Sequence, residues 1–136
     1  MEIKKSIAAI SAAALLTGIS LPAFAEGSWT SYLSGVKIGF ESRTWADRDV
    51  DQVATTVKLT NCSVSGASFA NAGLTLYQDT WIPYYYTNHG MIYNYCDSVS
   101  WGQGLGAGNY HFTVERINSS STTTRSLSAG SVVTGY

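Results

Sequence analysis

The sequence has little charge and few of the residues that mark catalytic or metal-binding sites. Only 12% of its residues are charged, and it has two histidines and two cysteines. It lacks a serine-nucleophile motif, a pair of metal-ligand histidines at helical spacing and a phosphate-cradling glycine pattern. We therefore predict no catalytic residue and no cofactor, and we favour a non-enzymatic protein.

Positive charge is scarce after residue 25. Residues 26–136 carry six Lys and Arg residues against eight Asp and Glu residues, a formal charge of −2. A protein that binds nucleic acid usually presents a basic face that displaces counterions. We therefore expect no nucleic-acid partner, and contact with an anionic membrane surface is not favoured.

The first 25 residues predict a cleavable secretory signal peptide. Lys4 and Lys5 precede an apolar stretch over residues 7–21, and residues 23–25 read Ala-Phe-Ala, the small-x-small pattern of a cleavage site. The apolar stretch is shorter than the ~20 residues that a membrane-spanning helix needs. We expect residues 26–136 to form a single secreted domain, either extracellular or periplasmic, with one core.

Cys62 and Cys96 are the only cysteines. An even number of cysteines in a small exported chain is the setting in which disulfides form and persist. We therefore predict one disulfide between them. It would join the ends of two strands, the first ending near Thr60 and the second passing through Ile92 and Tyr95.

Apolar residues alternate with a period of two in short segments separated by glycine, asparagine and serine, which predicts an all-β fold. We expect strands over residues 36–40, 53–60, 74–78, 91–96, 109–117 and 131–134, and a weaker strand over residues 29–33. Six or seven short strands suit a small antiparallel β-sandwich, immunoglobulin-like or jelly-roll-like, or a small barrel.

Tyr110 comes near the start of the expected strand over residues 109–117, directly after a glycine turn. In immunoglobulin-like sandwiches, a tyrosine near the start of such a strand closes a corner through its hydroxyl group. The position therefore favours a sandwich. The tryptophan and cysteine spacing of an immunoglobulin domain is absent.

Aromatic residues concentrate between residues 77 and 101, which hold eight of the thirteen tryptophans and tyrosines. Three consecutive tyrosines follow Pro83, and they cannot all face one side of a strand. Tyrosine and tryptophan offer a large, rigid contact area, which is why they concentrate in binding surfaces. The alternative is that these rings cap an open end of the sandwich. The predicted ligand-binding residues are Tyr77, Trp81, Tyr84, Tyr85, Tyr86 and Tyr93.

These observations favour a secreted, non-enzymatic binding domain that contacts an extracellular protein or a cell-surface glycan through the aromatic segment. One alternative is a small secreted toxin or bacteriocin whose aromatic residues lie at a lipid interface. Another is a secreted inhibitor or immunity protein whose braced loop fits a target. The sequence leaves the oligomeric state open.

Asp47, Asp49 and Asp51 alternate in one acidic segment. Oxygen ligands at every second position can wrap a calcium ion. The EF-hand pattern fails, because Gln52 stands where its turn glycine is needed and Lys58 where its bidentate glutamate is needed. We expect a solvated acidic turn with no metal, and these three aspartates are the candidates for the calcium alternative.

Overall fold

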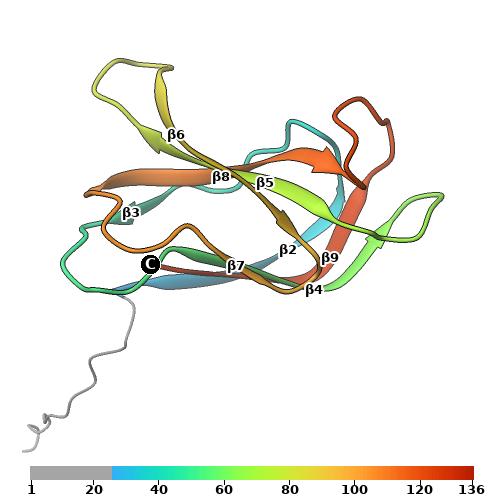
Figure 1. The fold of residues 1–136 in the computed structure, drawn as a ribbon, viewed down its shortest axis with the longest axis horizontal. Helices are drawn as coiled ribbons and strands as arrows, with labels where there is room; N and C mark the ends of the chain where they lie inside the picture. The colour runs from blue at the N-terminus through green and yellow to red at the C-terminus, as the bar shows by residue number, and fades with distance from the viewer. Residues whose placement is uncertain (1–25) are drawn as a thin grey trace, which may run out of the picture.

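The computed structural model describes residues 26–136, so the predicted signal peptide over residues 1–25 lies outside the described residues. The described part folds entirely with β-strands and turns and contains no helix (Figure 1). The strands are β2 (Ser28–Val36), β3 (Trp45–Asp47), β4 (Thr56–Val64), β5 (Ala72–Asp79), β6 (Tyr86–Asn94), β7 (Ser98–Ser100), β8 (Gly108–Ile117) and β9 (Leu127–Gly135).

These strands form two antiparallel sheets of four, with the orders β2-β9-β4-β7 and β3-β8-β5-β6. The two sheets lie as two layers in Figure 1, and the β5–β6 hairpin projects beyond its own layer. The predicted all-β antiparallel sandwich is therefore confirmed. The barrel alternative does not apply, since the strands form two separate sheets.

The core lies between the two sheets and follows the pleat of the central strands. Leu59 of β4 pairs with Val132 of β9, and Leu76 of β5 pairs with Phe112 of β8. All four side chains are fully buried. Residues at every second position of a strand point to the same face, so the alternation in the sequence becomes the apolar interior.

Aromatic rings fill one end of this core. The ring of Trp29 stacks on Phe112 at 6.4 Å between centroids, and Trp45 stacks on Tyr110 at 6.2 Å. The hydroxyl group of Tyr110 donates a hydrogen bond to the backbone oxygen of Gly106, four residues earlier. Burial, followed by the charges of nearby aspartates, raises the pKa of Tyr110 to about 12. The tyrosine that closes a corner through its hydroxyl is thus present.

One expected strand is wrong. Strand β2 ends at Val36, and the chain then turns, with the N–H of Phe40 bonded to the oxygen of Lys37. Gly39 has φ +96°, a conformation that glycine adopts without strain and that ends the alternation. The weaker strand expected at residues 29–33 is real and forms part of β2. The three-residue strands β3 and β7 were not expected from the sequence.

The predicted disulfide between Cys62 and Cys96 is confirmed, with Cα atoms 5.9 Å apart. Cys62 lies inside β4 rather than after it, and Cys96 lies in the turn after β6 rather than within a strand. The bond therefore joins one sheet to the end of the other. Such a covalent link is compatible with an oxidising location.

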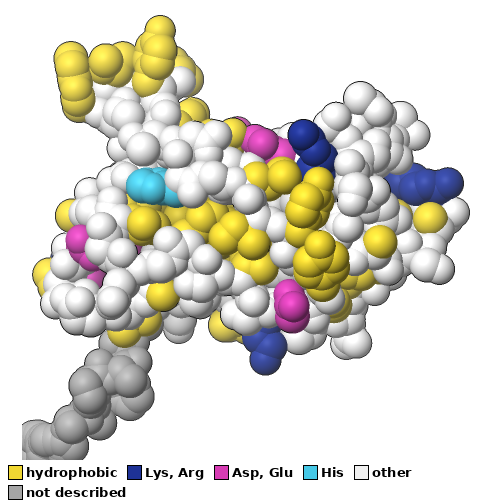
Figure 2. Space-filling view, in the orientation of Figure 1, with side chains coloured by type: hydrophobic (Ala, Val, Ile, Leu, Met, Phe, Trp, Pro, Cys, Tyr) yellow, Lys and Arg dark blue, Asp and Glu magenta, His cyan; other side chains and the backbone are white. Residues whose placement is uncertain are grey.

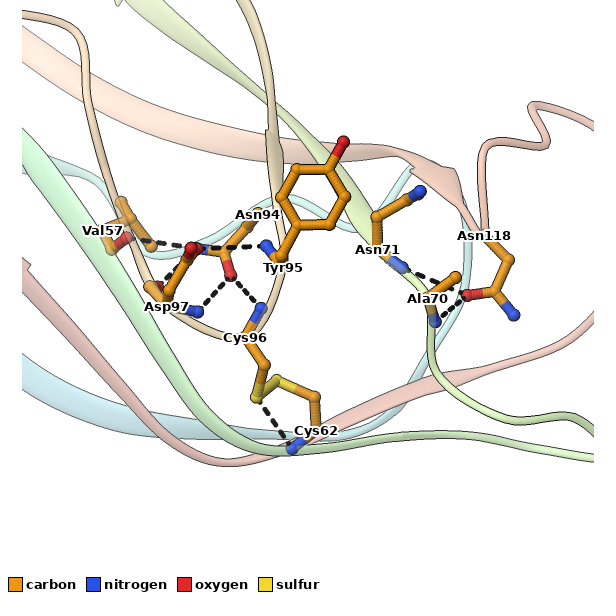
Figure 3. Close-up of a disulfide and its surroundings, with 9 residues drawn as sticks. All are labelled: Val57, Cys62, Ala70, Asn71, Asn94, Tyr95, Cys96, Asp97 and Asn118. Atoms are coloured by element: carbon orange, nitrogen blue, oxygen red, sulfur yellow. Dashed lines mark hydrogen bonds between the residues drawn. A yellow bond between two sulfur atoms is a disulfide. The ribbon is translucent and has the colours of Figure 1, made fainter.

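The buried side chain of Asn94 shapes the turn that carries Cys96 (Figure 3). Its amide group donates to the backbone oxygens of Val57 and Asp97, and its oxygen accepts the N–H groups of Cys96 and Asp97. These bonds hold Cys96 at φ +67°, which places its sulfur atom toward β4.

Candidate functional site

The tip of the β5–β6 hairpin is the most exposed apolar part of the described residues. Trp81 and Tyr84 are each 91% exposed, and Tyr85 is 66% exposed. Hydrophobic side chains gather on this projection in Figure 2. Residues 80–88 include no charged side chain. We call residues 80–86 the hairpin tip.

Hydrogen bonds fix the backbone of the hairpin tip. The Thr80 hydroxyl group is bonded to the backbone oxygens of Ile82 and Tyr85 and accepts the N–H of Ile82. The backbone N–H of Thr80 donates to the oxygen of Tyr85, and the N–H of Tyr85 donates to the oxygen of Ile82. Tyr84 sits at φ +66°, where side chains other than glycine are uncommon. The exposed rings are therefore presented by an ordered turn.

Below the tip, three rings gather on the outer face of the sheet β3-β8-β5-β6. Tyr77 of β5 is paired with His111 of β8, and their rings stack at 5.5 Å between centroids. Tyr86 packs edge-on against His111 at 5.2 Å and against Tyr77 at 6.0 Å. We call Tyr77, Tyr86 and His111 the ring cluster. Tyr86 belongs to both groups, so the cluster continues directly into the hairpin tip.

A carboxylate completes the polar edge of the ring cluster. The Tyr77 hydroxyl group donates to Oε2 of Glu115 at 2.5 Å. This hydrogen bond, together with partial burial and the negative charge of Glu41, raises the pKa of Tyr77 to about 12. Tyr77 therefore stays protonated at neutral pH. Its hydroxyl group and the Glu115 carboxylate form a fixed donor-acceptor pair on the surface.

Three outward-facing residues in or near the ring cluster are buried, although an open sheet face would leave them in water. Thr75 is 1% exposed, His111 is 5% exposed and Thr113 is 7% exposed. The hydroxyl oxygens of Thr75 and Thr113 have no hydrogen-bond partner among residues 26–136. Buried polar groups are normally paired, so these two hydroxyls mark the face as unusual.

In searches against protein-family models, curated proteins and solved structures, nothing matches this chain. Residues 26–136 contain no helix with the length and apolar character needed to span a membrane.

The structure gathers some of the expected binding residues and leaves one apart. Tyr77 and Tyr86 meet in the ring cluster, and Trp81, Tyr84 and Tyr85 share the hairpin tip. The sixth expected residue, Tyr93, is half-buried further along β6, opposite Gly73. No ring contact joins it to the cluster within the described part of the chain.

His111 and Glu115 were not among the residues predicted for this site. Alternation along β8 predicts only that the side chain of His111 points to the face opposite to that of Phe112. That it stands beside Tyr77 depends on the register between β5 and β8, which no local pattern specifies.

Two of the three aspartates considered for calcium, Asp47 and Asp51, accept backbone hydrogen bonds within their own segment. The Asp47 carboxylate accepts the N–H of Asp49, and the Asp51 carboxylate accepts the N–H of Val53. Burial is the main cause that raises the pKa of Asp47. Over residues 26–136, no group of three or more His, Cys, Asp or Glu side chains gathers as metal ligands.

His89, the other histidine, lies on the β6 edge and bonds to the Gln78 side chain through Nε2 at 2.8 Å. Burial lowers its pKa, because a buried site disfavours the charged imidazolium. Its ring also lies 5.8 Å from that of Tyr110. His89 and the ring cluster thus occupy different places on the hairpin.

Proposed function

We propose that the protein is a secreted, non-enzymatic binding domain that contacts an extracellular protein or a cell-surface glycan through the hairpin tip and the ring cluster. The observation that carries this proposal is the exposure of Trp81 and Tyr84 on an ordered, uncharged turn. The sequence pattern of residues 1–25 and the disulfide support export.

Burial of the exposed rings of the hairpin tip against a partner would contribute favourable free energy to binding. Burying one large apolar side chain contributes roughly 1.5–3 kcal/mol. Elsewhere in the chain, Trp29 and Trp45 are buried in the core, so this fold has room for tryptophan inside. Because the tip backbone is already fixed by Thr80, little conformational entropy is lost when a partner covers it.

The ring cluster adds hydrogen-bonding groups beside this apolar contact. The Tyr77 hydroxyl proton is already donated to Glu115, so the hydroxyl oxygen and the carboxylate offer acceptor oxygens at fixed positions. Tyr86, which is 44% exposed, belongs to both the ring cluster and the hairpin tip and connects them. A partner that combines apolar faces with hydroxyl or amide groups, as glycans and protein loops do, matches such a surface.

The test compares binding of the oxidised protein to intact bacterial and host cells, to a glycan array and to surface proteins extracted from the same cells. The variant is Trp81→Ala with Tyr85→Ala. The matched control is Tyr95→Ala, which removes a 61% exposed tyrosine in the β6–β7 turn outside the tip. We expect the tip variant to bind at least about tenfold more weakly than both the wild type and the control.

Equal binding by the tip variant and the wild type would refute this proposal, as would absence of binding to every surface and array. Vesicle leakage provides a separate arm. If the protein permeabilises zwitterionic or anionic vesicles and the tip variant does not, the tip acts on lipid, and the membrane-active alternative replaces the binding domain.

A further inference from the structure

A second site lies at the opposite edge of the sandwich from β6. A partly open pocket of about 90 Å³ lies between β2 and the segment that leads to β3. Its apolar walls come from Trp29, Leu33, Phe40, Phe112 and Val132. These residues belong to the core or pack against it, so the pocket reaches into the interior from the side of the molecule.

The pocket exists because two edges diverge there. The pairing of β2 with β9 is interrupted twice, between Ser31 and Leu33 and between Leu33 and Val36. On the other side, the N–H of Ser42 donates to the oxygen of Phe112, so this segment follows β8 and not β2. Irregular pairing of this kind bends an edge and redirects its side chains.

The volume of the pocket limits its occupant. Sites for whole small-molecule ligands usually measure about 300–1,000 Å³. A cavity of 150 Å³ in another protein holds one benzene molecule. About 90 Å³ therefore suits a single aliphatic side chain rather than a complete ligand of ordinary size. An aliphatic side chain buried in a pocket is one kind of anchor that protein interfaces use.

A positive charge stands beside the pocket. The exposed guanidinium of Arg43 lies 5.4 Å from the centre of the Trp29 ring, and Arg43 is one of the lining residues. Among residues 26–136, the one ion pair joins Arg48 to Glu26, so Arg43 has no carboxylate partner there. An arginine held over an aromatic ring keeps its hydrogen-bonding edge free for a carboxylate.

We propose that this pocket binds a leucine-sized side chain of an acidic peptide segment on a protein partner, with a neighbouring carboxylate of that segment bound by Arg43. The pocket supplies the apolar contact and Arg43 supplies the charge complementarity. This inference is independent of the hairpin tip, which lies on the β5–β6 edge of the other sheet.

The test is an NMR titration of the oxidised, ¹⁵N-labelled protein with the peptide acetyl-Asp-Leu-Asp-amide. We expect saturable shifts at the indole N–H of Trp29 and at the amides of residues 31–33 and 42–43. Acetyl-Asp-Ala-Asp-amide removes the apolar anchor and acetyl-Asn-Leu-Asn-amide removes the charges. Each change should weaken binding by about tenfold, since a buried anchor or a charge-assisted hydrogen bond contributes on that scale.

Two variants test the same parts on the protein. Ser31→Leu places a side chain from β2 into the pocket, and Arg43→Gln removes the charge. Both should weaken binding of the leucine peptide about tenfold or more, whereas Lys58→Gln, an exposed position on β4, should leave it unchanged. Retained dispersion of the amide spectrum shows that each variant is folded.

Three outcomes overturn the proposal. The first is no localised shift up to about 10 mM peptide, which is weaker than ordinary anchor contacts give. The second is binding that survives both Ser31→Leu and Arg43→Gln. The third is tighter binding of 4-methylpentanoate than of the leucine peptide at the same residues, which would assign the pocket to a small free acid.

Discussion

The outer faces of the two sheets differ sharply. On β2-β9-β4-β7, the outward residues are at least partly exposed, and the exposed ones include the polar residues Thr30 and Lys58 as well as Val133, which pairs with both. On β3-β8-β5-β6, the outward residues Thr75, His111 and Thr113 are buried, although no strand or helix covers that face. Burial runs unbroken over five residues in both β5 and β8.

Rings on the second face account for part of this difference. Tyr77 and Tyr86 pack against His111, so at that position a sheet face with no covering layer is locally buried. A surface built this way already has apolar faces and fixed polar groups at the outside. The contrast is therefore between a face whose outward strand residues stay at least partly exposed and a face on which several of them are buried.

The largest expected effect belongs to the interior that both sheets share. Phe112→Ala should lower the free energy of unfolding by about 4 kcal/mol, because it removes a fully buried ring stacked on Trp29. Lys58→Ala, an outward substitution on β4, should change it by less than about 0.5 kcal/mol. Urea denaturation measures both. A loss below about 1 kcal/mol for Phe112→Ala would show that the shared core does not dominate stability.

The disulfide links the two sheets, and its removal should cause the next largest loss in the free energy of unfolding. Cys62→Ala with Cys96→Ala should lower the free energy of unfolding by about 3 kcal/mol, since the bond closes a loop with a sequence separation of 34. Urea denaturation of the oxidised wild type, the reduced wild type and the double variant gives the comparison. We expect the reduced wild type and the variant to agree, and a large gap between them would assign the effect to the substituted side chains instead.

The hydrogen bond at the edge of the ring cluster tests whether the second face contributes to stability. Tyr77→Phe removes the bond to Glu115 and should lower the free energy of unfolding by about 1.5 kcal/mol, the low end for a bond to a charged group, because the site is partly solvated. Tyr32→Phe, at an exposed tyrosine of β2, is the control with no expected change.

The same bond has a pH signature. The pKa of Tyr77 rises from 10.0 to about 12 in the folded state, so its contribution is complete below pH 10 and is lost as the pH rises through 12. Tyr77→Phe should therefore flatten the loss of stability between pH 10 and 12. Tyr110, whose pKa is also raised to about 12, keeps part of the slope in both proteins. Identical slopes in the variant and the wild type would contradict the assignment to Tyr77.

A smaller effect of opposite sign is expected at Thr75, a buried residue on the outer face of the second sheet. Thr75→Val replaces a buried hydroxyl that has no partner among residues 26–136 with a methyl group of similar shape. Removing an unpaired buried polar group should raise the free energy of unfolding by about 1 kcal/mol. Thr30→Val, exposed on the other sheet, should leave it unchanged. Destabilisation by Thr75→Val would mean that a bound water satisfies the hydroxyl.

How much of this could be predicted from the sequence depends on whether a feature is local. Alternation identified β4, β5, β8 and β9, because the inward residues of each strand follow one another at every second position. It failed at residues 36–40, where Gly39 turns the chain within an alternating stretch. It also missed β3, whose three residues are too few to show a period.

The candidate site also has a part that local sequence predicts and a part that depends on strand pairing. The three tyrosines after Pro83 predicted that at least one ring is exposed or packed across a loop, since they cannot all face one side of a strand, and all three are exposed. The ring cluster depends on the pairing of Tyr77 with His111, which lie 34 positions apart in the sequence and meet only through strand register. The pocket beside Arg43 likewise needs the paths of β2 and β8 in space.

The smallest expected effect on stability is at the hairpin tip, where the contrast with the core tryptophans is greatest. Trp81→Ala with Tyr84→Ala should change the free energy of unfolding by less than about 0.5 kcal/mol, because both rings are in water in the folded and the unfolded chain. Thermal and urea denaturation check this, with Trp29→Ala as the destabilised reference. A loss above about 1 kcal/mol would mean that the rings brace the hairpin, as in the capping alternative. A neutral result leaves partner contact as the reason to hold two such rings on an ordered turn.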